Sequence, residues 1–429
     1  MNKSVLIISY YFAPHNEIGS IRPTKLAKFL TRMGYRVTVI CGKSPANRED
    51  TILARDLKEL RDVHVVEEPN VIRKREERKP STEPVPEKGA TATGAGWKRR
   101  WMDHLYIGYQ YVADKAFERL AIDELKRMNR LFDVVISSYG PHSCHRIAYQ
   151  AKKLGIAKRW IADFRDNVTM PFPFMNGRIA PYIERVRQSV DAMTVASDGF
   201  LRMMGLEDAG RVITNGFDAE DLLDVAAMRN EKLTLMYSGQ LFGFHRDLSP
   251  IFRALRSLVD EGELAMNDLE LLYAGRDEVS FLAQAQACGL GEAAVSVGYV
   301  GRAEALRLER SADALLLSVR NTNEVYGNLP GKLLEYMMLD KPVLGCACGD
   351  KPDCDAARIV RDTGLGLFTE EAAGDGEAFR EALRAYCRAY KAGEPLPFAP
   401  DRKAIQGFSH KAMTERFVEL IEAKRTVKQ

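Results

Sequence analysis

Short apolar runs alternate with amphipathic segments from the first residues of the chain onward. Residues 5–8 (Val-Leu-Ile-Ile) form such a run, and residues 26–33 then place four apolar side chains at helical spacing before Gly34. A second apolar run follows at residues 37–40. Short apolar runs are typical of buried strands, so this order predicts a strand, a helix and a strand. Strands joined through helices pair in parallel, with helices on both faces of the sheet.

The same alternation continues along the chain in two series. Further strand-like runs lie at residues 63–66, 134–136, 160–162 and 193–195, and then at 233–236, 269–273, 295–297, 314–317 and 343–344. The chain has 429 residues, too many for one ordinary core. We therefore predict two Rossmann-like α/β domains, residues 1–216 and 217–407, that face each other across a cleft. The last amphipathic helix, within residues 408–429, is expected to pack back on the N-terminal domain.

Residues 70–100 interrupt this pattern because they are rich in Lys, Arg, Glu, Pro, Gly and Thr. That composition predicts a flexible insertion. Its end, Trp97-Lys-Arg-Arg-Trp101, and the tyrosines that follow at 106, 109 and 111 mix basic and aromatic side chains. Such a segment suits an anionic membrane surface. It suits equally a helix whose rings pack on the sheet while its charges stay in water, and both interpretations remain open.

The overall charge is nearly balanced, with 62 Lys and Arg against 59 Asp and Glu and a formal net charge of +3. This balance gives no support to a nucleic-acid partner. The seven cysteines include a cluster at 346, 348 and 354 without paired Cys-x-x-Cys spacing, which favours reduced thiols in a cytosol over a zinc site. No apolar run approaches the roughly 18 residues of a membrane span. We expect a cytoplasmic protein, soluble or bound only at a membrane surface.

Two features of the N-terminal half lie just after predicted strands. Gly19 and Ser20 open the first helix, where free backbone amides attract phosphate or carboxylate groups. A plain turn with Ser20 as the N-cap is an equally good interpretation. His142 follows the strand that ends at residue 138, a position suited to donating to a phosphate or a sugar hydroxyl. The alternative is a histidine that only satisfies a helix terminus.

Two charged motifs also follow strands. In Asp163-Phe-Arg-Asp166, Arg165 and Asp166 could hold acceptor hydroxyls or a leaving phosphate, but an ion pair that orders a loop is favoured by roughly two to one. In the C-terminal half, Gly239 ends a strand and Arg246 precedes an amphipathic helix. Glycine exposes backbone amides, and arginine suits two-pronged contact with phosphate.

The most informative motif spans residues 327–343, Gly-Asn-Leu-Pro-Gly-Lys-Leu-Leu-Glu-Tyr-Met-Met-Leu-Asp-Lys-Pro-Val. Pro330 fits the first turn of a helix, and Lys332 and Glu335 are three residues apart on one helix face. The helix start and Lys332 can attract a diphosphate, and Glu335 can accept hydrogen bonds from a ribose diol. The alternative is an ordinary solvated Lys–Glu pair on the surface, which would contribute only about 0.3 kcal/mol to stability.

Taken in order, these motifs resemble those of the retaining GT-B glycosyltransferases of the group 1 (family 4) type. The motifs are Tyr10-Tyr-Phe-Ala-Pro with Gly19 and Arg22, Ser137-Ser-Tyr-Gly-Pro-His-Ser143, Asp163-Phe-Arg-Asp166, Thr214-Asn-Gly-Phe-Asp218, Tyr237-Ser-Gly-Gln-Leu241, Tyr273-Ala-Gly-Arg276, Gly298-Tyr-Val-Gly301, Lys332-Leu-Leu-Glu-Tyr336 and Lys341-Pro-Val343. The resemblance implies that a nucleotide sugar, UDP- or GDP-linked, binds the C-terminal domain. It also implies a glycan or lipid-linked acceptor on the N-terminal domain, in cell-surface polysaccharide biosynthesis at the cytoplasmic face of the inner membrane.

The resemblance also implies individual roles. Glu335 would hold the ribose, Arg246 and Lys332 would face the diphosphate, and the Gly19 amide would approach it from the other domain. His142 would lie near the transferred sugar. On the donor side we add Gly239, and on the acceptor side Arg22, Arg165 and Asp166.

Two positions depart from the family pattern. Many relatives carry a glutamate eight residues before Glu335, where this chain has Gly327, and Glu324 is out of register. Contact with the donor sugar would then be made by backbone amides near Asn328 and Leu329. Gln240 also stands where many relatives carry arginine.

The resemblance implies hexosyl or N-acetylhexosaminyl transfer with retention of configuration. We find no protein nucleophile and no metal-binding Asp-x-Asp at a strand end, so we expect no metal and no bound cofactor. Arg246, Lys332 and helix amides would stabilise the leaving diphosphate. Two alternatives remain: a nucleotide-sugar epimerase of the same fold, and a non-catalytic subunit that keeps the fold.

Overall fold

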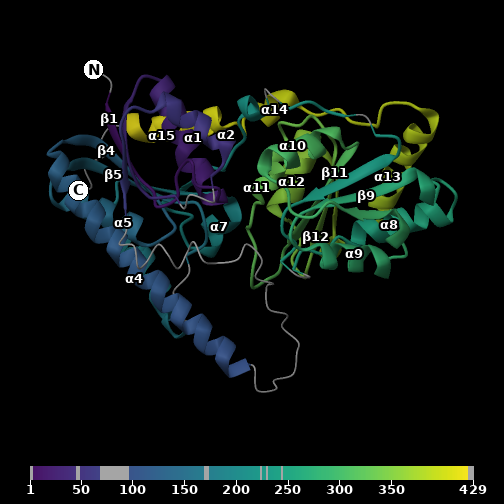
Figure 1. Cartoon of the computed structure of the whole chain (residues 1–429), viewed down its shortest axis with the longest axis horizontal. Helices are drawn as coiled ribbons and strands as arrows, with labels where there is room; N and C mark the ends of the chain where they lie inside the picture. Colours follow the sequence, from purple (N-terminus) through teal and green to yellow (C-terminus); the bar gives the residue numbers. More distant parts are fainter. Residues whose placement is uncertain are drawn as a thin grey trace. The chain divides into compact units, whose positions relative to one another are not determined.

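The computed structural model describes residues 3–44, 49–67, 96–168, 173–222, 225–228, 230–242 and 245–423. For the helical residues 96–110, only the backbone is described. The chain forms two compact units, Met1–Asn215 with His410–Gln429, and Gly216–Ser409. Each unit contains one sheet whose strands are all parallel (Figure 1).

The first unit has a seven-stranded sheet in the order β3-β2-β1-β4-β5-β6-β7. Its strands are β1 (Ser4–Ile8), β2 (Arg36–Gly42), β3 (Val63–Val66), β4 (Phe132–Ser138), β5 (Ala157–Phe164), β6 (Ala192–Val195) and β7 (Gly210–Val212). The order reverses between β1 and β4. Neighbouring strands pair in parallel throughout, as the connecting helices require.

Helices cover both faces of the first sheet (Figure 1). On one face lie α1 (Ile18–Arg32), α2 (Thr51–Asp56) and α15 (His410–Glu422); on the other lie α4 (Gly96–Met128), α5 (Ser143–Lys153), α6 (Ile179–Ser189) and α7 (Asp198–Met203). Because side chains alternate along a strand, Val5 and Ile7 join the core under α1 and α15. Leu6 and Ile8 join the core under α4 and α5.

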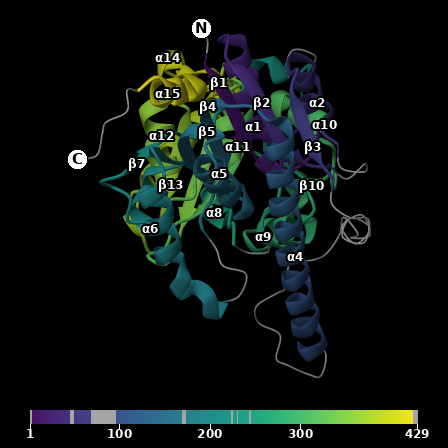
Figure 2. The same ribbon diagram turned by 90° about the vertical axis from the view of Figure 1, so that its left-hand side faces the viewer.

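The C-terminal helix α15 belongs to the first unit. It packs against α1 and contributes Met413, Phe417 and Ile421 to the core on that face of the sheet. On the opposite face α5 lies beside α4, and Figure 2 shows α4 continuing as one long helix past the sheet.

The second unit repeats the architecture with six parallel strands in the order β10-β9-β8-β11-β12-β13. The strands are β8 (Leu233–Ser238), β9 (Leu269–Ala274), β10 (Ala294–Ser296), β11 (Ala314–Arg320), β12 (Val343–Cys348) and β13 (Gly366–Glu370). The helices are α8 (Ser249–Asp260), α9 (Glu278–Ala287), α10 (Arg302–Ser311), α11 (Gly331–Tyr336), α12 (Asp355–Thr363), α13 (Gly376–Ala392) and α14 (Arg402–Gln406). Residues of α8, α9 and α13 form one core with β8 and β9, while α10, α11 and α12 contact β8, β11 and β12.

Every apolar run that predicted a strand forms one, but β7 and β13 were not predicted. Both are edge strands, and β7 has only three residues, so neither carries a strong pattern. Of the predicted insertion, residues 70–95 lie outside the described residues. Residues 96–100, which were predicted to belong to the insertion, instead form the start of α4.

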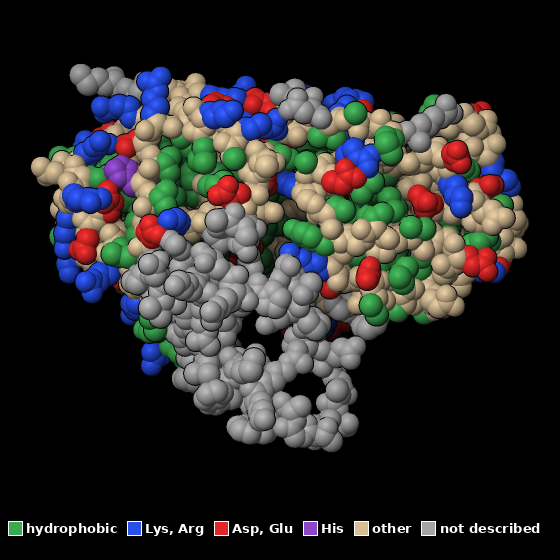
Figure 3. All heavy atoms as spheres, in the orientation of Figure 1, with side chains coloured by type: hydrophobic (Ala, Val, Ile, Leu, Met, Phe, Trp, Pro, Cys, Tyr) green, Lys and Arg blue, Asp and Glu red, His purple; other side chains and the backbone are tan. Residues whose placement is uncertain are grey.

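No helix in the described part of the chain is long and apolar enough to cross a membrane. On the face of each unit that Figure 3 shows, basic and acidic side chains are interspersed. The segment considered for membrane contact, residues 97–101, has a helical backbone, and its side chains lie outside the described residues.

Candidate functional site

The two sheets share one topological feature, a strand order that reverses between β1 and β4 and again between β8 and β11. In open parallel sheets, ligands bind beyond the carboxyl ends of the strands at such a switch point. The candidate residues therefore divide into two groups, one in each unit. The second unit's group follows β8 and β11, and the first unit's group follows β1, β4 and β5.

In the second unit, Lys332 lies between two carboxylates at the start of α11. Its Nζ is 2.8 Å from Glu309 Oε1 and 2.9 Å from Glu335 Oε2. Glu309 comes from α10, its side chain is fully buried, and it also accepts a hydrogen bond from the Ser238 hydroxyl at the end of β8. A Cβ placed on Gly239 would lie 3.8 Å from Lys332 Cε, so this glycine is next to the lysine stem.

Opposing effects set the protonation of this cluster. Burial alone would lower the pKa of Lys332, but the negative charges of Glu309 and Glu335 outweigh it and raise that pKa. Burial raises the pKa of Glu309, with Glu335 adding to the rise. Burial opposes ionisation of Glu335 too, but the charges of Lys332 and Arg302 prevail and lower its pKa. Lys332 is thus charged, and the two carboxylates fix the position of its ammonium group.

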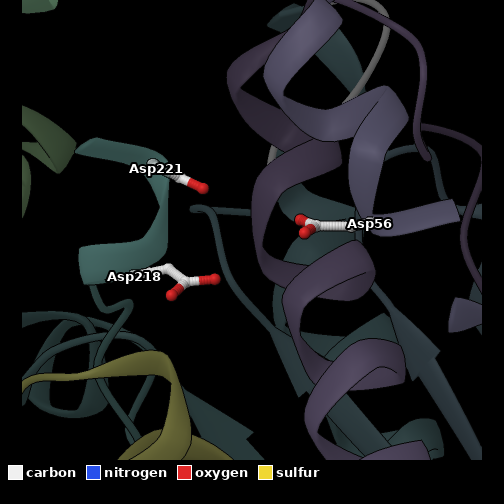
Figure 4. A group of neighbouring side chains, drawn as sticks. All are labelled: Asp56, Asp218 and Asp221. Atoms are coloured by element: carbon white, nitrogen blue, oxygen red, sulfur yellow. The ribbon is translucent and has the colours of Figure 1, made fainter. Parts of the chain in front are cut away.

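The cluster continues through Arg302, whose Nε is 3.6 Å from Glu335 Oε1 and whose Nη2 is 3.0 Å from Asp221 Oδ2. Asp221 belongs to the 3-10 segment η3 (Ala219–Leu222), and Asp218 just precedes it, with both carboxylates pointing the same way (Figure 4). The third carboxylate in that view, Asp56, ends α2 of the first unit. It is paired there with lysines 25 and 28, each at 2.8 Å.

The other donor-side candidates surround this cluster on loops. Arg246 donates from Nη1 to Gln240 O at 3.2 Å and to the Tyr237 hydroxyl at 3.3 Å, which fixes its side chain near the end of β8. Asn328 is exposed and Leu329 is buried. Gly327 has a φ of +75°, so a glutamate could not replace it without backbone strain.

In the first unit, Arg22 is an interior residue that is only 2% exposed. It forms a two-pronged ion pair with Asp163, with both nitrogen–oxygen distances at 2.8 Å, and donates to the carbonyls of Ile213 and Thr214. These bonds join α1 to β5 and to residues 213–214, near the end of the segment Met1–Asn215.

Arg165 is also largely committed to the framework. Its Nε donates to Tyr139 O at 2.6 Å, its Nη2 donates to Gly140 O at 3.2 Å, and its side chain is 6% exposed. A Cβ on Gly19 would lie 2.3 Å from Arg165 Nη1, so the absence of a side chain at Gly19 makes room for this guanidinium. Asp166, in contrast, is 67% exposed at its side chain and 3.8 Å from Arg165.

Beside these residues a groove of ≈ 950 Å³ lies wholly within the first unit. Its walls come from the loops after β1 and β4 and from α4, α5 and α6. His142 lines the groove near the end of β4. Its Nε2 is 3.3 Å from the Tyr139 hydroxyl, and its ring lies edge-on to the Tyr182 ring with 4.9 Å between the ring centres. Asp166 also lines the groove, whereas Gly19, Arg22 and Arg165 do not line it.

Sequence reasoning singled out Lys332, Glu335 and Gly239, which the structure brings together, but it missed Glu309 and Arg302. The signal for Glu309 was weak: it is a charged residue three positions after the buried Leu306, on the face of α10 that meets the sheet. The sequence analysis also missed Tyr182, a residue of α6 that lines the groove.

No protein-family profile matches the chain, and no curated protein matches its sequence. Solved structures do match it along nearly its whole length. They include the N-terminal domain of trehalose-6-phosphate phosphatase from Candida albicans (12% identity, 98% of this chain and 97% of that chain, TM-score 0.60). The pneumococcal O-GlcNAc transferase, solved with UDP and GlcNAc, matches with 10% identity, 98% and 99% coverage and a TM-score of 0.54. WaaG, a glycosyltransferase involved in lipopolysaccharide biosynthesis, matches with 15% identity, 98% and 100% coverage and a TM-score of 0.52.

These likenesses are all at low sequence identity and show the fold. Together with the two parallel sheets and their shared strand order, they establish the predicted α/β fold of two Rossmann-like units, the GT-B type.

Proposed function

We propose that this protein is a retaining glycosyltransferase. It would transfer a hexosyl or N-acetylhexosaminyl group from a UDP- or GDP-linked donor to a glycan or lipid-linked acceptor, in cell-surface polysaccharide biosynthesis. Of the solved structures named above, two are glycosyltransferases, one solved with UDP and the other involved in lipopolysaccharide biosynthesis. Both support the proposal through the fold they share with this chain.

The observation that carries the proposal is the charge cluster of Lys332, Glu335 and Glu309 at the switch point of the second sheet. A buried carboxylate holds the lysine beside Gly239, where two strand ends meet. An ordinary surface ion pair would not need a fully buried partner. A group that must present a fixed positive charge to a ligand does need its position fixed.

In the proposed reaction the leaving diphosphate gains negative charge as the bond to the sugar breaks. Lys332 and Arg246 would stabilise that charge, and Glu335 would accept hydrogen bonds from the ribose. The acceptor hydroxyl would attack the face that the diphosphate leaves and lose its proton to the departing phosphate. His142, at the groove of the first unit, would contact the transferred sugar. No step requires a metal, so we expect turnover to survive a chelator.

Thermal stabilisation by UDP, by GDP and by sugars linked to either nucleotide tests the donor site. A ligand at about 100 times its dissociation constant adds about 2.7 kcal/mol to the stability of the folded protein. We expect one nucleotide class to stabilise the wild type and to lose this effect in Glu335→Ala. Glu304→Ala is the matched control, because Glu304 lies on neighbouring α10 and pairs with Arg307. No response to any nucleotide would favour a non-catalytic protein.

Product analysis then separates a transferase from an epimerase. With the nucleotide sugar identified, NMR of the reaction should show an acceptor-dependent product with the anomeric configuration of the donor. Conversion of the donor sugar without an acceptor would instead identify an epimerase. An inverted product would disprove retention while leaving transfer intact.

We also propose a cytoplasmic location with peripheral attachment to an anionic membrane surface through Lys98, Arg99 and Arg100. Co-sedimentation with phosphatidylglycerol vesicles should fall when these three residues are neutralised together. Binding that does not change would disprove this attachment.

A further inference from the structure

The groove of the first unit follows one face of α5 and one face of α6. On α5, residues 142, 145, 146 and 149 line it, which is the spacing of a single helix face. On α6, residues 182, 185, 186 and 189 do the same, and Arg178 lines the groove from just before that helix. Its volume of ≈ 950 Å³ is near the upper end of the roughly 300–1,000 Å³ typical of small-molecule sites, so it has room for more than one sugar ring.

The floor of the groove combines aromatic rings with polar atoms that have no partner. The Tyr182 hydroxyl oxygen and His145 Nε2 are buried and have no hydrogen-bond partner among the described residues. His145 is 1% exposed, and leaving such a buried group unpaired destabilises the folded protein. A ligand that brings its own donors and acceptors would remove this cost. Tyr149, which also lines the groove and is 42% exposed, offers a ring of the kind that packs on the apolar side of a sugar.

The hydrogen-bond network assigns the tautomer of His145. Trp160 Nε1 donates to Ser137 Oγ at 2.7 Å, and Ser137 Oγ lies 2.8 Å from His145 Nδ1. Among the described residues, His145 Nδ1 is the one acceptor that the Ser137 hydroxyl reaches, so the serine hydrogen goes to Nδ1 and the histidine proton is on Nε2. Burial lowers the pKa of His145 to about 3, so the ring is neutral and offers one N–H donor.

Part of the positive charge at the rim of the groove has no carboxylate partner among the described residues. Arg146 is paired with Asp114 at 2.6 Å and with Glu118 at 2.7 Å. Arg178, which directly precedes α6, and Arg185 on α6 are both exposed, and neither has a carboxylate partner among the described residues. Two free guanidinium groups beside an aromatic groove favour a ligand with phosphate or carboxylate oxygens, which arginine binds in two-pronged fashion.

We propose that the acceptor is an anionic glycan that carries a phosphate or a carboxylate. Its ring hydroxyls bond to the Tyr182 hydroxyl and to His145 Nε2, and its anionic group binds Arg178 and Arg185. This inference rests on the proposed function, because it identifies the substrate class of the acceptor site. We therefore expect a neutral glycan of the same size to bind this groove more weakly.

Isothermal titration of the full-length protein tests the inference with two matched probe pairs. Trigalacturonate against maltotriose examines a carboxylate, and glucose 6-phosphate against glucose examines a phosphate. The test variant is Arg178→Gln with Arg185→Gln. The control is Arg187→Gln on the same helix, since Arg187 pairs with Asp208 and does not line the groove. Arg178 and Arg185 are exposed, and 39% of the Arg187 side chain is exposed, so all variants should fold.

We expect at least one anionic probe to bind about tenfold or more tightly than its neutral match, since each charged contact is strong. The double variant should lose that preference and the control should keep it. The preferred probe identifies the anionic group. Equal binding of anionic and neutral probes, anionic binding unchanged in the double variant, or no binding of any probe would overturn the inference. Nucleotide stabilisation measured on the same samples reports on the proposed function separately, because it depends on Glu335.

Discussion

Replacing Lys332 by methionine should strongly destabilise the second unit. Among the described residues, Lys332 is the one cation within 4 Å of the buried Glu309 carboxylate. At 2.8 Å and an effective dielectric constant of about 20, their attraction is roughly 6 kcal/mol, part of which desolvation offsets. Removing one partner of a buried pair typically costs about 3–5 kcal/mol, because the remaining charge is left unpaired. For a unit of this size that corresponds to a fall in Tm of about 6–20 °C.

The loss should depend on pH in a defined direction. Burial already raises the pKa of Glu309, and removal of the lysine raises it further. The folded variant then binds a proton that the unfolded chain releases, so its stability falls as pH rises above the ordinary glutamate range. We therefore expect the destabilisation by Lys332→Met to be smaller at pH 5 than at pH 8.

Urea unfolding followed by circular dichroism at both pH values measures the effect. Lys391→Met is the matched control, because Lys391 is exposed in the same unit and its ammonium group donates to the Gly262 carbonyl instead of to a buried carboxylate. The double variant Glu309→Leu with Lys332→Met removes both charges and should recover most of the lost stability. If Lys332→Met costs no more than the control, or if the double variant is less stable than the single one, the buried-pair argument is wrong.

Three further predictions concern the first unit. The pKa of His145 is lowered to about 3 from about 6.5 in the unfolded chain, so wild-type stability should fall by about 1.4 kcal/mol per pH unit as pH drops below 6.5. His145→Gln should lack this slope in urea unfolding between pH 6 and 4.5, and an unchanged slope would contradict the assignment. Gly19→Ala should cost about 1–3 kcal/mol because its Cβ would lie 2.3 Å from a guanidinium nitrogen, whereas Gly177→Ala, with open space around it, should be nearly neutral in the same denaturation assay. Arg22→Met should cost about 3–5 kcal/mol by leaving Asp163 buried and unpaired, and a thermal melt within 1 °C of wild type would refute this.

Part of the candidate site followed from local sequence. Lys332 and Glu335 lie three residues apart on one helix, and the structure shows their charged atoms 2.9 Å apart. Gly239 ends β8, as the apolar run before it predicted. These features depend on helix geometry and on strand ends, which a short stretch of sequence defines.

Other parts depended on residues distant in sequence. Arg22 and Arg165 have charges that suit a ligand, yet the structure uses them to bind Asp163 and the carbonyls after β4. Glu309 reaches Lys332 only because α10 and α11 pack on neighbouring strands, β8 and β11. A motif identifies the type of side chain but not the partner that folding supplies.

The sequence by itself determined the two series of strands and helices, because each buried strand needs an apolar run and each covering helix needs an apolar face. It thereby determined the two-unit α/β fold. Only the tertiary structure decided which charged residues are already neutralised inside the protein and which remain available. That outcome depends on burial and on distances between segments, and the Coulomb and desolvation energies that govern it change by several kcal/mol over a few ångströms.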